Sequence, residues 1–141
     1  MASNLKEKSD TSYEGGCFCN AIKFTVTADT FWSILCYCKS CTKISGAPVV
    51  AWAGFVKNQI HWTGEQICEF SSSKGVKRGF CKKCGASIFF KMNKSNIISI
   101  SAGLFDKSLK LKTNRNIFTK NRLKYYSLDR DIPKFSRHSK Q

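Results

Sequence analysis

The chain has 141 residues and a formal net charge of +15, from 24 Lys and Arg residues against nine Asp and Glu residues. This length suits one domain with a modest core, and no run of eighteen apolar residues predicts a membrane span. The polar start lacks the apolar segment of a secretory signal, so the eight cysteines are expected as thiols or metal ligands of a cytoplasmic protein, not as disulfides.

The beginning of the chain predicts a disordered leader followed by a metal-binding loop. Residues 1–12 are polar and have no periodicity. Residues 13–20 contain the motif GGCFCN, in which two cysteines are separated by one residue. We expect Gly15 and Gly16 to allow the backbone conformations that turn both thiolates inward.

Short runs of alternating apolar and polar residues predict most of the remaining fold. The expected strands span residues 21–28, 31–35, 49–56, 59–62, 66–71, 86–92, 96–104 and 116–119, and residues 76–80 lead into the last pair of cysteines. Residues 42–46 are too short for a stable helix and are expected as a single turn, while Pro133 keeps residues 128–135 out of a ladder. No window has a sustained 3.6-residue repeat, so the sequence predicts an all-β domain of short strands around metal loops.

Seven cysteines fall into three groups whose spacings of one or two residues let neighbouring thiolates converge on one soft ion. Two pairs together supply the four ligands of a closed tetrahedral site. We therefore expect one structural zinc that joins the front of the chain to its middle. Its ligands are Cys17, Cys19, Cys81 and Cys84.

The middle motif, CYCKSC, supplies three further ligands: Cys36, Cys38 and Cys41. Three protein ligands and one free position are typical of catalytic zinc, so we expect an open site here. Three thiolates make the ion a weak Lewis acid towards water but suit it to one more soft ligand, and coordination deprotonates a thiol. The alternative is a closed, supporting site whose fourth ligand is Cys68, although a lone cysteine in a strand is more often a small buried hydrophobe.

The segments GGCFCNAIKF, CYCKSCTKISGAPVVAWAGF and RGFCKKCGASIFF, in this order, resemble the glutathione-dependent formaldehyde-activating enzyme family, which includes centromere protein V. The resemblance covers residues 13–135 and leaves residues 136–141 as a basic tail end. It implies a zinc-bound, Mss4-like β domain with two Zn²⁺ ions per chain. It also implies a carbon–sulfur lyase-like enzyme acting on glutathione adducts of formaldehyde or a related small aldehyde, such as S-hydroxymethylglutathione.

The same resemblance assigns roles near the middle motif and shows two departures. Gly46, Ala47 and Pro48 match the family's segment after this motif, so we expect them to form a wall of the glutathione pocket, with plain packing as the alternative. Tyr37 stands where the family often has His, and Asn20 stands where it often has Gly. Neither residue is a ligand in our assignment.

The charge distribution supports a rival function from another class. Residues 107–141 contain eleven Lys or Arg and two Asp, a net charge of +9, with interleaved aromatic residues. A non-catalytic, zinc-folded module that binds nucleic acid through this surface, with a nuclear location, is the second hypothesis. A zinc or redox buffer is the third.

Two smaller expectations concern single residues. His61 and His138, the only histidines, are not expected to act as general bases, because they lie outside the cysteine groups. Trp52 and Phe55 are three residues apart in a predicted strand and should therefore lie on opposite faces, so that at most one of them lines the pocket.

Overall fold

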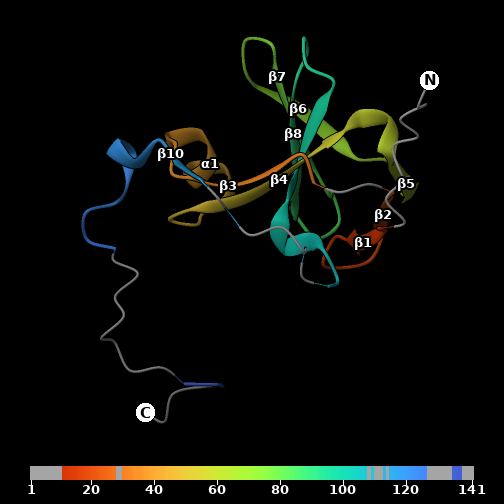
Figure 1. The fold of residues 1–141 in the computed structure, drawn as a ribbon, viewed down its shortest axis with the longest axis horizontal. Coiled ribbons are helices and arrows are strands. Elements are labelled where there is room, and N and C mark those ends of the chain that lie inside the picture. Colours follow the sequence, from red (N-terminus) through yellow and green to blue (C-terminus); the bar gives the residue numbers. More distant parts are fainter. Residues whose placement is uncertain are drawn as a thin grey trace, which may run out of the picture.

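The computed structural model describes residues 11–27, 30–107, 109, 113, 115–126 and 135–137. Within these residues, ten strands form two sheets, and one α-helix and three short 3-10 helices accompany them (Figure 1). None of the described helices has the length and apolar composition needed to span a bilayer. The expected all-β domain is therefore confirmed.

The smaller sheet has three antiparallel strands in the order β1-β2-β5. They are β1 (Tyr13–Gly16), β2 (Ile22–Val26) and β5 (Ile60–Gly64). The alternation predicted for residues 21–28 is confirmed in β2, where Ile22, Phe24 and Val26 are buried and the residues between them are more exposed.

The expectation that residues 13–20 form one loop is wrong for its first half, which is the strand β1. Gly15 is needed in this strand because there is no room for a side chain at its position. A Cβ atom at this position would lie 2.3 Å from the backbone oxygen of Leu104 and 2.5 Å from the ring of Phe24. Close packing against Leu104 and Phe24, and not a turn, therefore explains why residue 15 is a glycine.

The larger sheet has seven strands in the order β10-β3-β4-β9-β8-β7-β6. They are β3 (Trp32–Cys36), β4 (Val50–Val56), β6 (Cys68–Ser73), β7 (Val76–Phe80), β8 (Ser87–Met92), β9 (Ile97–Ser101) and β10 (Arg115–Ile117). All neighbours are antiparallel except β10, which runs parallel to β3. This order places two neighbouring hairpins, β6–β7 and β8–β9, at one side of the sheet.

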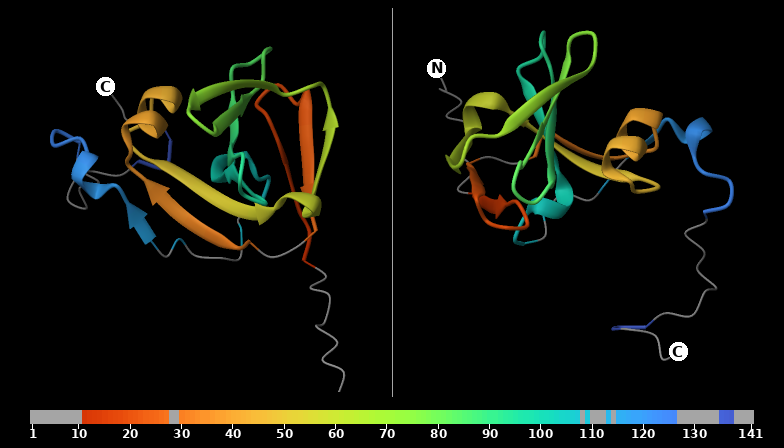
Figure 2. Two further views of the ribbon diagram at one scale, coloured as in Figure 1. Left: turned by 90° about the horizontal axis from the view of Figure 1, so that it is seen from above. Right: turned by 180° about the vertical axis from the view of Figure 1, so that it is seen from behind.

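The faces of the larger sheet belong to two separate apolar clusters. One face packs on the smaller sheet, with Phe55 and Phe89 buried between the two. The other face carries Trp52 and Phe90, whose rings meet edge to face with centroids 4.9 Å apart. Two views agree that the smaller sheet lies at one end of the molecule and that α1 and β10 lie at the other (Figures 1 and 2).

The single α-helix, α1 (Lys39–Ser45), replaces the turn that was expected over residues 42–46. The turn prediction was wrong because the helix begins three residues earlier, where the Cys38 side chain accepts a hydrogen bond from the backbone N–H of Cys41. Gly46 ends the helix in the left-handed conformation, with φ of 68°. The cap at the start therefore uses one of the candidate metal ligands.

The remaining differences lie at the ends of elements. The strand expected over residues 96–104 ends at Ser101 and continues as the 3-10 helix η2 (Ala102–Leu104). The other two are η1 (Lys57–Gln59) and η3 (Thr119–Asn121). Most of the expected leader, most of the loop over residues 128–135 and the end of the basic tail lie outside the described residues.

Candidate functional site

The first cysteine group lies where two turns meet. Cys17 and Cys19 follow β1, and Cys81 and Cys84 follow β7. Their four sulfur atoms all lie within 4.8 Å of one another. The Cys17 and Cys19 sulfurs are 3.6 Å apart, and those of Cys19 and Cys81 are 3.8 Å apart. A tetrahedral ion with Zn–S bonds of about 2.3 Å needs sulfurs about 3.8 Å apart, so the donor set fits a closed zinc site.

Backbone hydrogen bonds hold both turns in place. The Cys17 N–H donates to the Ile22 carbonyl at 3.0 Å, and the Ile22 N–H donates to the Cys17 sulfur at 3.3 Å. In the second turn the Gly85 N–H donates to the Cys81 carbonyl at 2.8 Å, and Gly85 adopts φ of 76°. A glycine is suited to this position because it accepts the left-handed conformation without strain.

The second group is built by the end of β3 and the start of α1. Cys36 is the last residue of β3, Cys38 caps the helix, and Cys41 lies in its first turn. The three sulfur atoms also lie within 4.8 Å of one another. No fourth Cys, His, Asp or Glu of the described residues joins them, and Cys68 on β6 belongs to neither group. This donor set fits a soft ion with one position left for another ligand.

The thiols of this group shift each other's ionisation in opposite directions. Burial, with the adjacent thiols of Cys38 and Cys41, raises the pKa of Cys36 to about 12. Burial also opposes ionisation of Cys38, but the backbone N–H of Cys41, the neighbouring thiols and the charge of Arg78 together hold its pKa below the ordinary value. A metal ion bound among the three sulfurs would favour their ionised forms.

Arg78 supplies a fixed positive charge beside the second group. Only 6% of this residue is exposed, and both of its terminal nitrogens lie 3.7 Å from the Cys41 sulfur. Its Nε donates to the Ser72 hydroxyl at 3.0 Å, and its guanidinium lies over the ring of Phe90 at 5.5 Å. A buried guanidinium with these partners stabilises negative charge on Cys41.

Sequence reasoning missed Arg78, although one signal was present. In the alternation of VKRGF, Arg78 occupies the same face as the apolar residues Val76 and Phe80. A charged residue at an inward position of a strand needs a partner. The partner is remote in sequence, since Cys41 lies 37 residues earlier.

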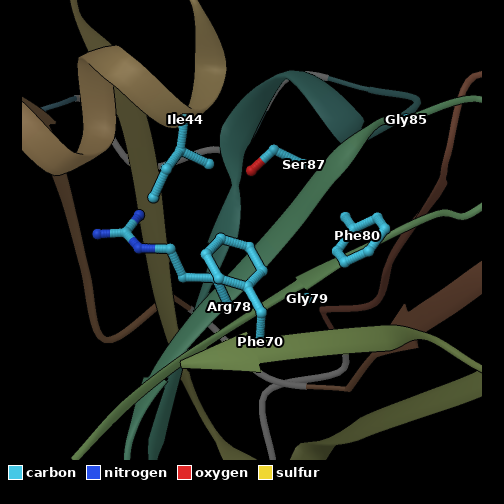
Figure 3. A pocket seen from close by; sticks show the side chains of 7 residues that line it. All are labelled: Ile44, Phe70, Arg78, Gly79, Phe80, Gly85 and Ser87. Atoms are coloured by element: carbon cyan, nitrogen blue, oxygen red, sulfur yellow. The ribbon is translucent and has the colours of Figure 1, made fainter. Parts of the chain in front are cut away.

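A pocket with a volume of about 460 Å³ opens beside the second group. It is lined by Ile44, Phe70, Arg78, Gly79, Phe80, Gly85 and Ser87. Figure 3 shows Ile44 and Ser87 pointing into a space that Phe70 and Phe80 border from the other side. Helix α1 thus contributes through Ile44, and the segment Gly46, Ala47 and Pro48 is not among the lining residues.

Three other singled-out residues, His61, Trp52 and Phe55, are not among the residues that line this pocket. His61 is exposed on β5, in the smaller sheet, and His138 lies outside the described residues. The prediction that Trp52 and Phe55 occupy opposite faces is confirmed, because each packs in a different apolar cluster. Trp52 adjoins the second cysteine group, in the same cluster as Cys36 and Cys41.

Comparisons with known proteins agree with this geometry. The family model described as "Glutathione-dependent formaldehyde-activating enzyme" matches residues 12–121. A Schizosaccharomyces pombe protein named "uncharacterized lyase" is 31% identical over 94 residues, which cover 66% of this chain and 68% of that protein. The crystal structure of a Rhodobacter sphaeroides protein matches with a TM-score of 0.58 at 16% identity, covering 73% of this chain and 98% of that one. The last match shows a shared fold.

Proposed function

The chain belongs to the family of glutathione-dependent formaldehyde-activating enzymes, and from this premise we propose that it is a carbon–sulfur lyase acting on adducts of glutathione with a small aldehyde. The family and the lyase-named relative support an enzyme of lyase type. The observation that carries the finer proposal is the group of Cys36, Cys38 and Cys41, which no other described metal-ligating side chain completes.

We assign the two cysteine groups different tasks. The group of four, which joins the turns after β1 and β7, would hold a structural zinc. The group of three would hold the catalytic ion. Zinc bound by the three cysteines would supply a soft Lewis acid that lowers the pKa of an incoming thiol.

The reaction needs no oxidant or reductant. In the synthetic direction, the glutathione sulfur forms a bond to the aldehyde carbon, the carbonyl becomes an alcohol, and the thiol proton ends on that oxygen. The reverse direction breaks the carbon–sulfur bond. The protein must therefore hold sulfur and carbonyl carbon together, provide donors for the oxygen and limit access of water.

The chain's own residues suit these tasks. A guanidinium has five N–H groups, and Arg78 uses one on Nε for Ser72 and one on each terminal nitrogen for Cys41. The remaining two N–H groups have no partner among the described residues and would suit a ligand carboxylate or oxygen. The Ser87 hydroxyl, which makes no hydrogen bond within the described part of the chain, points into the pocket as a second donor (Figure 3). Phe70 and Phe80 add apolar walls to the pocket.

The alternative function expected from the sequence gains no support from these comparisons. Neither the family nor the lyase-named relative refers to nucleic acid. Much of the basic segment over residues 107–141 lies outside the described residues. The enzyme hypothesis therefore has the stronger basis.

The proposal is tested by two-dimensional NMR exchange between free and glutathione-bound ¹³C-formaldehyde, because this adduct also forms without an enzyme. We expect the wild-type protein to accelerate the exchange and Cys38→Ser to abolish that acceleration. Cys68→Ser is the matched control, since it removes a thiol that belongs to neither group. An exchange rate that the wild-type protein leaves unchanged, or that Cys38→Ser preserves, would overturn the proposal.

A further inference from the structure

The pocket beside Cys41 is much larger than the hydroxymethyl group that formaldehyde would place there. Its volume is about 460 Å³, whereas a water molecule occupies about 30 Å³ in the liquid. A hydroxymethyl group has only two heavy atoms, so it would leave most of this space empty. The pocket therefore has room for a substituent on the glutathione sulfur that is larger than a hydroxymethyl group.

The chemistry of the walls indicates what that larger group is. Beside Arg78, the large side chains on the lining are the apolar residues Ile44, Phe70 and Phe80, and the two phenyl rings meet edge to face with centroids 6.1 Å apart. Ile44 is 36% exposed and Phe70 is 39% exposed, so apolar surface faces solvent on both sides of the pocket. Covering such surface with an apolar group is favourable.

The apolar pocket is continuous with the three-cysteine group. Ile44 follows Cys41 by three residues on α1, and residues at this spacing share one face of a helix. Arg78 belongs to both regions, because it lines the pocket and binds the Cys41 sulfur. A ligand whose sulfur approaches the cysteines thus places its other substituent among Ile44, Phe70 and Phe80.

We propose that the substrates of this site are glutathione hemithioacetals of apolar aldehydes, with branched alkyl or aromatic groups of about four to seven carbons. The inference rests on the proposed function, since it names the substrate class of the same site. The chemical step is unchanged: the sulfur bonds to the aldehyde carbon, the carbonyl oxygen takes the thiol proton, and the reverse restores thiol and aldehyde. Phe70 and Ile44 then act as specificity-determining residues.

Stable thioethers test the substrate class without turnover. Isothermal titration of the metal-loaded protein would use S-methyl-, S-butyl- and S-benzylglutathione as probes. Each methylene that enters an apolar site contributes about a fourfold gain in affinity, so the step from methyl to butyl predicts roughly 60-fold tighter binding. Phe70→Ala should lower this ratio about fivefold or more, because one apolar wall is removed. Met92→Ala is the control, since Met92 is an exposed apolar residue of β8 outside the pocket.

Activity provides the second measurement. NMR exchange with glutathione should give a higher kcat/KM for 3-methylbutanal and benzaldehyde than for formaldehyde, and Phe70→Ala should reverse this order. Glutathione binding with affinities that do not rise with the length of the S-alkyl group would overturn the inference while leaving the proposed function intact. If neither glutathione nor any thioether binds, the proposed function fails as well.

Discussion

Arg78 is the residue whose removal tests the electrostatics of the three-cysteine group most directly. Its two terminal nitrogens lie 3.7 Å from the Cys41 sulfur, and the side chain is 6% exposed, so solvent screens this interaction little. Opposite unit charges at about 4 Å interact by about 4 kcal/mol at an effective dielectric constant of about 20. The N–H···S bonds belong to the charge-assisted class, which contributes about 1.5–3 kcal/mol.

We expect Arg78→Met to weaken metal binding at the three-cysteine group by about 3 kcal/mol, or roughly 100-fold. The group of four should keep its affinity for the metal, because Arg78 contacts none of its four sulfur atoms among the described contacts. Arg78→Lys keeps a charge but loses the paired donors, so the metal affinity of its three-cysteine group should fall between those of the wild type and Arg78→Met. Lys77→Met is the matched control, since Lys77 is exposed on the same strand and points to the other face.

The assay is a competition titration against a chromophoric zinc chelator, with the metal count of each protein measured by native mass spectrometry. Cobalt substitution adds a second signal, because thiolate-to-cobalt charge-transfer absorption reports each site separately from activity. A second site in Arg78→Met whose affinity stays within about threefold of the wild-type value, about 0.7 kcal/mol, would refute the reasoning. It would mean that the cysteines hold their charge without help from the guanidinium.

Two further predictions concern the group of four and one surface ion pair. Cys81→Ser should unfold the domain, since a structural zinc contributes on the order of 10 kcal/mol to the free energy of folding. Cys38→Ser should lose one metal ion and keep its circular dichroism spectrum. Equal unfolding of both variants in a thermal melt would contradict this division of tasks between the two groups. The Lys83 ammonium binds Glu65 and holds the pKa of that carboxyl below its ordinary value of 4.5. Because the pKa is lowered in the folded state, the stability that this pair contributes is present above pH 4.5 and is lost as the pH falls through the folded pKa. Urea unfolding of the wild type and Glu65→Gln should therefore differ above pH 4.5 and converge in more acidic buffer, and a constant difference would argue against the ion pair.

Sequence reasoning predicted the strands and the grouping of the cysteines because both depend on local patterns. Alternation along residues 21–28 reflects one buried face of that strand, so it was visible without coordinates. The spacing of the cysteines likewise limits which thiols can share an ion, and the structure brings together the same two groups. The helix α1 was underestimated because its cap is a cysteine, a residue that common capping patterns do not include.

The pocket and its charge depend on contacts between segments that are distant in the sequence. Strand pairing sets Phe70 and Phe90 on either side of Arg78, which turns the guanidinium towards a helix 37 residues earlier in the chain. The cysteine spacing by itself indicated which thiols lie together and could hold a metal ion. Only the tertiary structure decided that Arg78 and the apolar pocket lie beside the three-cysteine group. The reason is that a strand's partners follow from the order of the sheet and not from the strand's own residues.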